Sequence, residues 1–245
     1  MHIRILGSAA GGGFPQWNCN HPNSRRARRK DFTASPRTQS SLAISSDRKN
    51  WFLFNASPDL RQQINENLIL QPQPDGPLRA SPIAGVVVTN ADVDHIAGLL
   101  NLRESQALQL YATGRVLEVL AANPIFQVLH SKFVQRRPLQ LEHDHMLCLP
   151  DGNSSGLLIR PFAVPGKVAL WLEDSSNFDT DATSWNKNYN PIFAQALNMS
   201  RGLQPGNRVA GDYFGADNFQ GIADLARPSY LTPQVPGEKG MYFSP

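Results

Sequence analysis

The sequence has only two cysteines, Cys19 and Cys148, among its 245 residues. Two thiols so far apart in the chain do not make a disulfide framework, and they are typical of a protein in a reducing cytosol. No apolar run approaches the roughly 18 residues that a membrane-spanning helix requires, so we expect no membrane span. The opening residues, MHIRILGSAAGGG, contain no basic segment leading into a long apolar stretch, and we expect no signal peptide. The sequence therefore predicts a cytoplasmic protein.

Strong charge of either sign is also lacking, since the formal net charge is only +3. Much of the basic excess lies in one run, RRARRK, at residues 25–30. Such a run can bind nucleic acid, but it is more often a solvated loop. Because no aromatic residue alternates with these arginines, we do not expect nucleic acid to be a partner.

Two kinds of catalytic motif are missing as well. The glycine-rich segment at 7–13 has neither the GxGxxG nor the GK[ST] spacing of a nucleotide-binding loop. Its glycines instead indicate a backbone that turns tightly beside a site. There is no GxSxG sequence and no cysteine nucleophile with a recognisable partner, so a serine or cysteine hydrolase is not expected.

What the sequence does contain is a regular series of alternating, apolar and helically periodic runs. The predicted strands are residues 2–6, 40–45, 51–57, 83–89, 108–113, 139–150 and 156–164. The predicted helices are residues 57–68, with Ser57 as a cap, 96–104 and 115–123. Strands dominate the first 60 residues and alternate with helices afterwards, which indicates an α/β sandwich of sheets with helices outside.

The C-terminal part has a different composition. Hydrophobic periodicity fades after about residue 175, and glycine and proline become frequent between residues 201 and 245. That composition is typical of chain without regular structure. We therefore predict one domain over residues 1–175 and an irregular tail over residues 176–245.

A polar elbow follows the predicted strand at 83–89. Asn90, Asp92, Asp94 and His95 come after three consecutive valines, and an apolar segment begins directly behind them. A carboxylate and an imidazole at a strand end can hold a divalent ion if other ligands join them. Alternatively, Asp94 caps the following helix and His95 packs against it, which is the commoner outcome for such residues. The residues alone leave both interpretations open.

Two further clusters carry metal-ligating residue types. Cys19 and His21 lie two apart in a loop and can both ligate zinc, although a loop with a free thiol is the commoner outcome. His143 and His145 share a face if residues 139–150 form one strand, which gives a surface metal site or, more commonly, a solvated strand edge. No histidine follows His145, so other ligands at the elbow must be Asp, Glu or backbone groups.

Five segments together resemble the coenzyme PQQ synthesis protein B family. They are ILGSAAGGGFPQWNCN at 5–20, RTQSSLAIS at 37–45, WFLFNASPDLRQQ at 51–63, DHIAGLLNLRE at 94–104 and VPGKVALWLED at 164–174. The resemblance covers roughly residues 1–175 and does not extend to the C-terminal part. It implies a metallo-β-lactamase-like fold, an αββα sandwich, here incomplete.

The resemblance also implies a role in the biosynthesis of pyrroloquinoline quinone (PQQ), a redox cofactor built from a Glu–Tyr pair of a precursor peptide. One role proposed for the family is iron-dependent hydroxylation of the precursor tyrosine, and an open site of carboxylates and imidazole suits Fe(II). The other is a non-catalytic carrier involved in transport of PQQ or its precursor to the periplasm. Both roles stay open, and in both the partner is PQQ or its Glu–Tyr-derived precursor.

Departures from the family concern its metal ligands. The family's CNCxxC cysteines bind zinc, but here His21 and Ser24 replace the second and third, so we expect Cys19 and His21 to bind zinc weakly. At the elbow Asp94 and His95 match the family, while Asn90 and Asp92 stand where the wider superfamily has histidines. The family's later histidine-bearing segments do not occur in this sequence. We therefore expect a depleted Fe(II) site at the elbow, with slow or absent hydroxylation.

Overall fold

The structure is a computed structural model and describes residues 1–164 and residue 169. The predicted boundary near residue 175 and the predicted tail over 176–245 lie outside the described residues. Six strands of the described chain form one mixed sheet whose spatial order follows the sequence. They are β1 (His2–Gly7), β2 (Ser41–Ser45), β3 (Trp51–Phe54), β4 (Ile83–Val87), β5 (Leu108–Thr113) and β6 (Val134–Leu139).

The type of strand pairing changes once across this sheet. β1, β2 and β3 pair antiparallel, whereas β3 to β6 pair in parallel. Parallel neighbours need crossover connections, and helices supply them here. These are α2 (Leu60–Asn65), α3 (Val93–Ile96) and α4 (Gly114–Ala122), with the 3-10 helices η1 (Leu68–Leu70), η2 (Ala97–Leu102) and η3 (Pro124–Val128).

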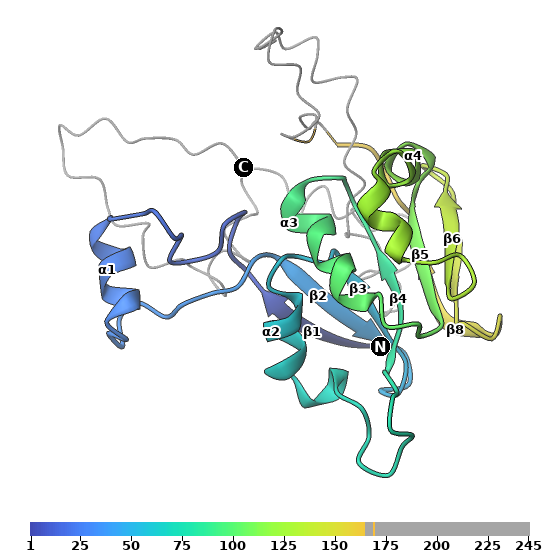
Figure 1. Cartoon of the computed structure of the whole chain (residues 1–245), viewed down its shortest axis with the longest axis horizontal. Helices are drawn as coiled ribbons and strands as arrows, with labels where there is room; N and C mark the ends of the chain where they lie inside the picture. The colour runs from blue at the N-terminus through green and yellow to red at the C-terminus, as the bar shows by residue number, and fades with distance from the viewer. Residues whose placement is uncertain (165–168, 170–245) are drawn as a thin grey trace, which may run out of the picture.

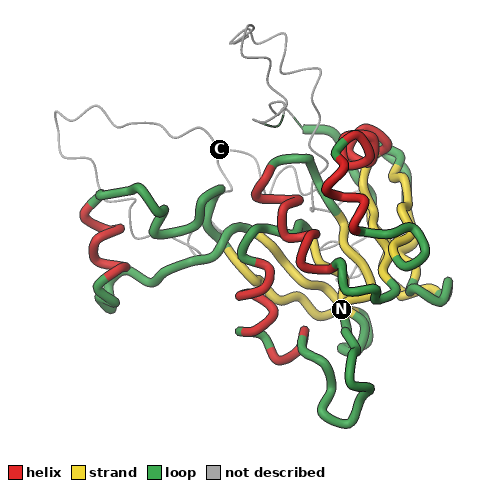
Figure 2. Tube along the Cα trace, in the orientation of Figure 1, coloured by secondary structure: helices red, strands yellow, loops and turns green. Residues whose placement is uncertain are grey.

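The six-stranded sheet separates two hydrophobic cores. Trp51 and Leu53 of β3 pack in the core beneath the helices, which gather over one face of the sheet (Figure 2). Phe52 and Phe54, which alternate with them, pack on the other face against a second, two-stranded sheet of β7 (His145–Cys148) and β8 (Ser154–Ile159). This alternation gives the layers helix, sheet and sheet, as the α/β pattern predicted.

The basic run at 25–30 belongs largely to a helix, α1 (Pro22–Arg28), so the prediction of a loop there was wrong. Pro22 occupies the first turn, where its missing N–H costs no hydrogen bond, and the His21 side chain accepts a bond from the Asn23 N–H. The basic side chains are solvent-exposed, as predicted. Figure 1 shows α1 lying to one side of the sheet rather than over it.

The predicted strand over 139–150 is wrong in its first half. Residues 141–143 form a turn, with Glu142 in the left-handed region at φ 61°, and β7 begins only at His145. β6 was not predicted, because arginines and Pro138 interrupt its apolar alternation. Pro138 is tolerated because β6 lies at an edge of the sheet.

Two predicted helices also differ in detail. α2 starts at Leu60 without a side-chain cap, and the Ser57 hydroxyl is buried without a hydrogen-bond partner, so Ser57 is not the cap. The helix predicted from residue 96 begins earlier, at Val93, and tightens into η2 at Ala97. Among the residues that the structure describes, no helix is long and apolar enough to cross a bilayer.

Candidate metal centre

The polar elbow lies where β4 leaves the buried sheet. Val86, Val87 and Val88 are all buried, and the chain then turns sharply. Asn90 Oδ1 accepts a hydrogen bond of 2.8 Å from the Asp92 N–H, so the Asn90 amide oxygen belongs to the turn itself. Asp92 is the N-cap residue of α3, but its side chain makes no capping hydrogen bond. The elbow therefore presents the first turn of α3 at the end of a rigid strand.

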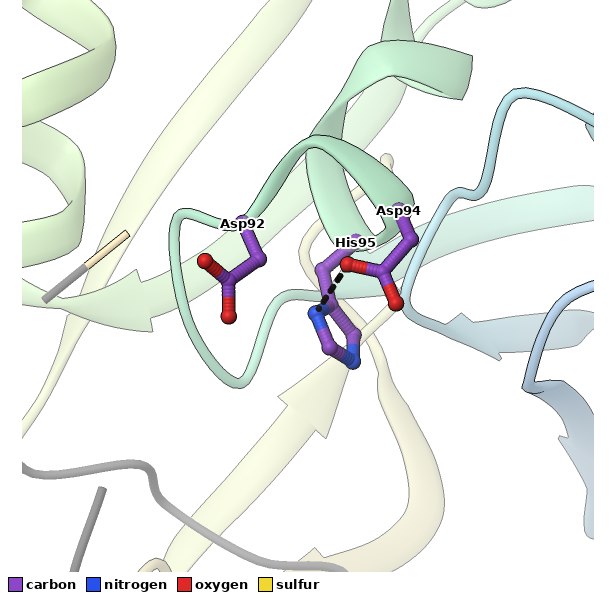
Figure 3. Close-up of side chains that lie close together, drawn as sticks. All are labelled: Asp92, Asp94 and His95. Atoms are coloured by element: carbon purple, nitrogen blue, oxygen red, sulfur yellow. Dashed lines mark ion pairs between the residues drawn. The ribbon is translucent and has the colours of Figure 1, made fainter. Parts of the chain in front are cut away.

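Three side chains of this elbow converge. Asp92, Asp94 and His95 each offer one ligand atom, and these atoms all lie within 4.8 Å of one another. All three residues are half-buried. Figure 3 shows the His95 ring between the two carboxylates. A convergence of two carboxylates and one imidazole at this separation is suited to a divalent metal ion.

The contacts within the group leave one ring nitrogen without a hydrogen bond. His95 Nδ1 lies 3.3 Å from Asp94 Oδ1 (Figure 3), and this buried nitrogen has no hydrogen-bond partner. Burial acts to raise the pKa of Asp94, but the His95 imidazole beside it outweighs burial, and the pKa of Asp94 is lowered. Asp94 is therefore ionised at neutral pH, as a metal ligand must be.

Asn55, at the end of β3, fixes the elbow from the neighbouring strand. Its side-chain oxygen accepts hydrogen bonds from the Thr89 N–H at 2.9 Å and the Thr89 hydroxyl at 3.0 Å. The adjacent Ala56 N–H donates to the His95 carbonyl at 2.8 Å. Asn55 has a φ of 62°, which is uncommon for a residue with a side chain and is often found near functional sites.

The glycine-rich loop forms the other side of the centre. A Cβ atom placed on Gly11 would lie 3.3 Å from Asp94 Oδ2, so the Gly11 backbone packs directly on that carboxylate. Gly12 and Gly13 have φ values of 89° and 72°, which glycine adopts without strain. The prediction of a tight turn beside a site thus describes this loop correctly. Sequence reasoning did not single out Asn55 or Gly11, although Asn55 directly follows a buried strand.

An open cavity of about 470 Å³ adjoins the same loop. Its walls come from β1, the loop, residues 36–38 and α2, and they include Gly12, Phe14, Arg37, Asp59 and Glu66. Its size is within the range of small-ligand sites. The Arg37 guanidinium gives it a donor for a carboxylate group.

The other predicted ligands do not join the elbow. Cys19 Sγ accepts a hydrogen bond of 3.1 Å from the Ser24 hydroxyl, which lowers the pKa of the Cys19 thiol. His21 Nδ1 accepts from the Asn23 N–H at 3.3 Å. Neither residue belongs to a group of three ligand side chains in the described part of the chain, and zinc binding there stays a prediction.

His143 and His145 are not paired on one strand. His143 Nδ1 lies 2.8 Å from the Leu141 carbonyl oxygen, within the turn. His145 Nε2 accepts from the Gln140 N–H at 3.0 Å. Backbone groups thus engage both rings, and the geometry assumed for a surface metal site is absent from these residues.

Three comparisons with known proteins agree with one another. The family model of the β-lactamase superfamily domain matches residues 50–186. Coenzyme PQQ synthesis protein B of Gluconacetobacter diazotrophicus is 54% identical over 173 residues, which are 71% of this chain and 56% of that protein. The protein of the same name from Rhodopseudomonas palustris strain CGA009 is 50% identical over 75% of this chain and 59% of its own length.

The solved structures give the same picture. Zn²⁺-bound PqqB from Methylobacterium extorquens has a TM-score of 0.66 and 49% identity, over 72% of this chain and 56% of that one. A diphosphatase of the PhnP family, with a TM-score of 0.53 and 19% identity, shares the fold. The described residues thus have the metallo-β-lactamase fold that the sequence predicted. The chain spans between 56% and 59% of the length of these PQQ synthesis relatives.

Proposed function

The chain belongs to the β-lactamase superfamily and, over about residues 1–175, to the coenzyme PQQ synthesis protein B family, and we propose that it takes part in PQQ biosynthesis. The observation that carries the proposal is the convergence of Asp92, Asp94 and His95 at the strand end, in a chain about half identical to those relatives. We place this role in the cytoplasm, since both Cys19 and Cys148 are free thiols.

The residues of the elbow fit a divalent metal ion, and they indicate which kind. Asp92 and Asp94 provide hard oxygen ligands, and His95 provides a ring nitrogen that lacks a hydrogen bond. An oxygen-rich set of this kind favours Fe²⁺ or Mn²⁺ over Zn²⁺. When bound, ferrous iron would supply the redox chemistry that hydroxylation of a tyrosine ring requires, with dioxygen as the oxidant and an external two-electron reductant that converts the second oxygen atom to water.

The protein contributes position and binding to this reaction. Asp92 is the N-cap residue of the short helix α3, and Asp94 and His95 lie within it. Asn55 holds Thr89 before the elbow and the Ala56 N–H holds the His95 carbonyl, so we expect the ligands to be positioned before an ion binds. We assign the Glu–Tyr-derived precursor to the cavity beside the glycine-rich loop, where Arg37 offers a guanidinium group for a carboxylate of its glutamate part. Because only one imidazole is present in the described ligand set, we expect slow turnover.

The cavity also supports a second role, that of a non-catalytic carrier in the transport of PQQ or its precursor. Binding in the cavity through Arg37 needs no metal ion, and both molecules carry carboxylates. This role predicts tight binding of the precursor or PQQ, with no chemical change in either.

One assay separates the two roles. The full chain is incubated with Fe²⁺, dioxygen, ascorbate as the two-electron reductant and a synthetic Glu–Tyr precursor, and the product mass is measured. The hydroxylase role predicts the gain of one oxygen atom, lost in His95→Ala and retained in His143→Ala, whose ring lies in an exposed turn. No gain of oxygen with the unchanged chain, together with precursor binding that Arg37→Ala weakens, contradicts the hydroxylase role and supports the carrier.

A further inference from the structure

Gln39, which is only 6% exposed, connects the glycine-rich loop to the start of α2. Its side-chain oxygen accepts a hydrogen bond of 3.0 Å from the Gly12 N–H. Its side-chain nitrogen donates to Asp59 Oδ2 at 3.0 Å, and its backbone N–H donates to the same oxygen at 2.9 Å. The Gly12 backbone, the Gln39 amide and the Asp59 carboxylate thus form one continuous chain of hydrogen bonds.

Each group in this chain has a single possible role. The Gly12 N–H can only donate, and an ionised carboxylate can only accept. The Gln39 amide, which has one accepting and one donating end, is therefore fixed in one orientation between them. Glutamate at position 39 would present two accepting ends and would face the Asp59 carboxylate with like charge. Replacing the NH2 group of this amide with an oxygen, as Gln39→Glu does, therefore tests the connection.

The same loop rests on a proposed metal ligand. Gly11 precedes Gly12, and its backbone lies so close to Asp94 that an added Cβ would meet Oδ2 at 3.3 Å and Cγ at 3.4 Å. Contacts this short require a shift of a few tenths of an ångström in a neighbour. Metal sites tolerate displacements of only about 0.2 Å in ligand distance. The position of the loop therefore limits where the Asp94 carboxylate can lie.

We propose that Gln39 and Asp59 are positioning residues of the metal centre, which act through Gly12 and Gly11 to hold the Asp94 carboxylate in place for the ion. This inference rests on the proposed metal centre. The ligands of the centre all come from one elbow. The positioning residues come from two other segments, since Gln39 lies just before β2 and Asp59 just before α2. Neither Gln39 nor Asp59 is itself a ligand of the ion.

Gly11→Ala tests the contact between the loop and Asp94. Gly11 does not have a positive φ, so alanine there adds a methyl group without backbone strain. We expect the affinity for Mn²⁺, measured by calorimetry on the full chain, to fall roughly 10- to 100-fold, as for changes in groups that orient metal ligands. Gly114→Ala is the matched control, because a Cβ there meets nothing within 4 Å. The two metal-free variants should melt at similar temperatures.

Gln39→Glu tests the tether itself, with Asp59→Asn as its partner change. We expect Gln39→Glu to weaken Mn²⁺ binding and to speed hydrogen exchange of the Gly12 amide. In the double variant the amide introduced at position 59 removes the like charge and can donate to the carboxylate introduced at position 39, but its nitrogen cannot accept from the backbone N–H of residue 39 as Asp59 Oδ2 does, so we expect both properties to recover in part. A purely structural role for Gln39 would lower the melting temperature without this paired recovery of metal affinity.

The outcomes distinguish this inference from the proposed function. If the unchanged chain binds Mn²⁺ and His95→Ala does not, while Gly11→Ala and Gln39→Glu bind as well as the unchanged chain, the positioning role is wrong and the metal centre stands. If the unchanged chain binds no Mn²⁺, or His95→Ala binds it equally well, both the metal centre and the positioning role are wrong.

Discussion

At the scale of single residues, the chemistry of the elbow was predictable and its surroundings were not. Asp92, Asp94 and His95 are close in sequence, so their convergence needs only one turn of chain. Gln39 bonds to a residue 27 positions away in the sequence, and Asn55 bonds to one 34 positions away. No local sequence pattern predicts such contacts. Polar residues directly after buried strands are the one signal that pointed towards the elbow and Asn55.

The thiol of Cys19 gives a prediction at this scale. Ser24 is buried with its hydroxyl 3.1 Å from Cys19 Sγ, so cysteine at position 24 would place a second thiol beside the first. We expect Ser24→Cys to raise the affinity for Zn²⁺ under reducing conditions, because a thiolate is added to Cys19 and His21. Zinc content after dialysis measures this, with the exposed Ser35→Cys as control. Equal zinc content in both variants would show that the loop does not bind zinc.

At the scale of elements, strands that are continuous apolar runs were predictable, whereas β6, whose apolar alternation is interrupted, was not. Buried runs such as β4 and β5 are continuous and apolar, and they formed where they were expected. The conversion of α3 into η2 depends on tertiary packing instead. A Cβ on Gly98 would lie 2.1 Å from the Ser57 carbonyl oxygen, so helix and strand end pack backbone to backbone at that point. Sequence periodicity does not predict that two backbone segments pack this closely.

Gly98→Ala should therefore be strongly destabilising. The neighbouring atoms belong to the backbone of Ala56 and Ser57 and cannot move aside cheaply. We expect the free energy of unfolding to fall by about 3 kcal/mol, at the upper end of what overpacking costs. Urea unfolding measures the loss, and Gly114→Ala should leave stability unchanged or slightly raised. A Gly98→Ala chain as stable as that control would contradict the close packing of η2 on the end of β3.

The hairpin between β2 and β3 gives a prediction about pH. Burial acts to raise the pKa of Asp47, but hydrogen bonds from Asn50, Lys49 and Ser45 outweigh burial and lower the pKa well below its usual value. The resulting stability is present above the ordinary Asp pKa and is lost as pH falls through the lowered value. We expect the difference in unfolding free energy between the unchanged chain and Asp47→Asn to be largest near neutral pH and to shrink in acid. A difference in unfolding free energy that grows in acid would contradict the lowered pKa of Asp47.

At the scale of the whole molecule, the fold and family followed from the sequence, while the division at residue 175 stays a prediction. The motifs at 37–45 and 51–63 contain β2 and β3, two neighbouring strands of one sheet, so such motifs specify part of the arrangement of strands. The layers helix, sheet and sheet bring the glycine-rich loop, the end of β3 and the elbow after β4 to one place. The candidate metal centre is a product of that arrangement, and its ligands alone do not define it.

Anaerobic binding of Fe²⁺ to the full chain tests whether Asp92, Asp94 and His95 form a metal centre. Calorimetry would compare the unchanged chain with Asp92→Asn, Asp94→Asn and His95→Ala, with His143→Ala as a matched control outside the elbow. We expect each of the three elbow changes to weaken or abolish Fe²⁺ binding, whereas His143→Ala should bind Fe²⁺ like the unchanged chain. Fe²⁺ binding that survives all three elbow changes would contradict a metal centre formed by Asp92, Asp94 and His95.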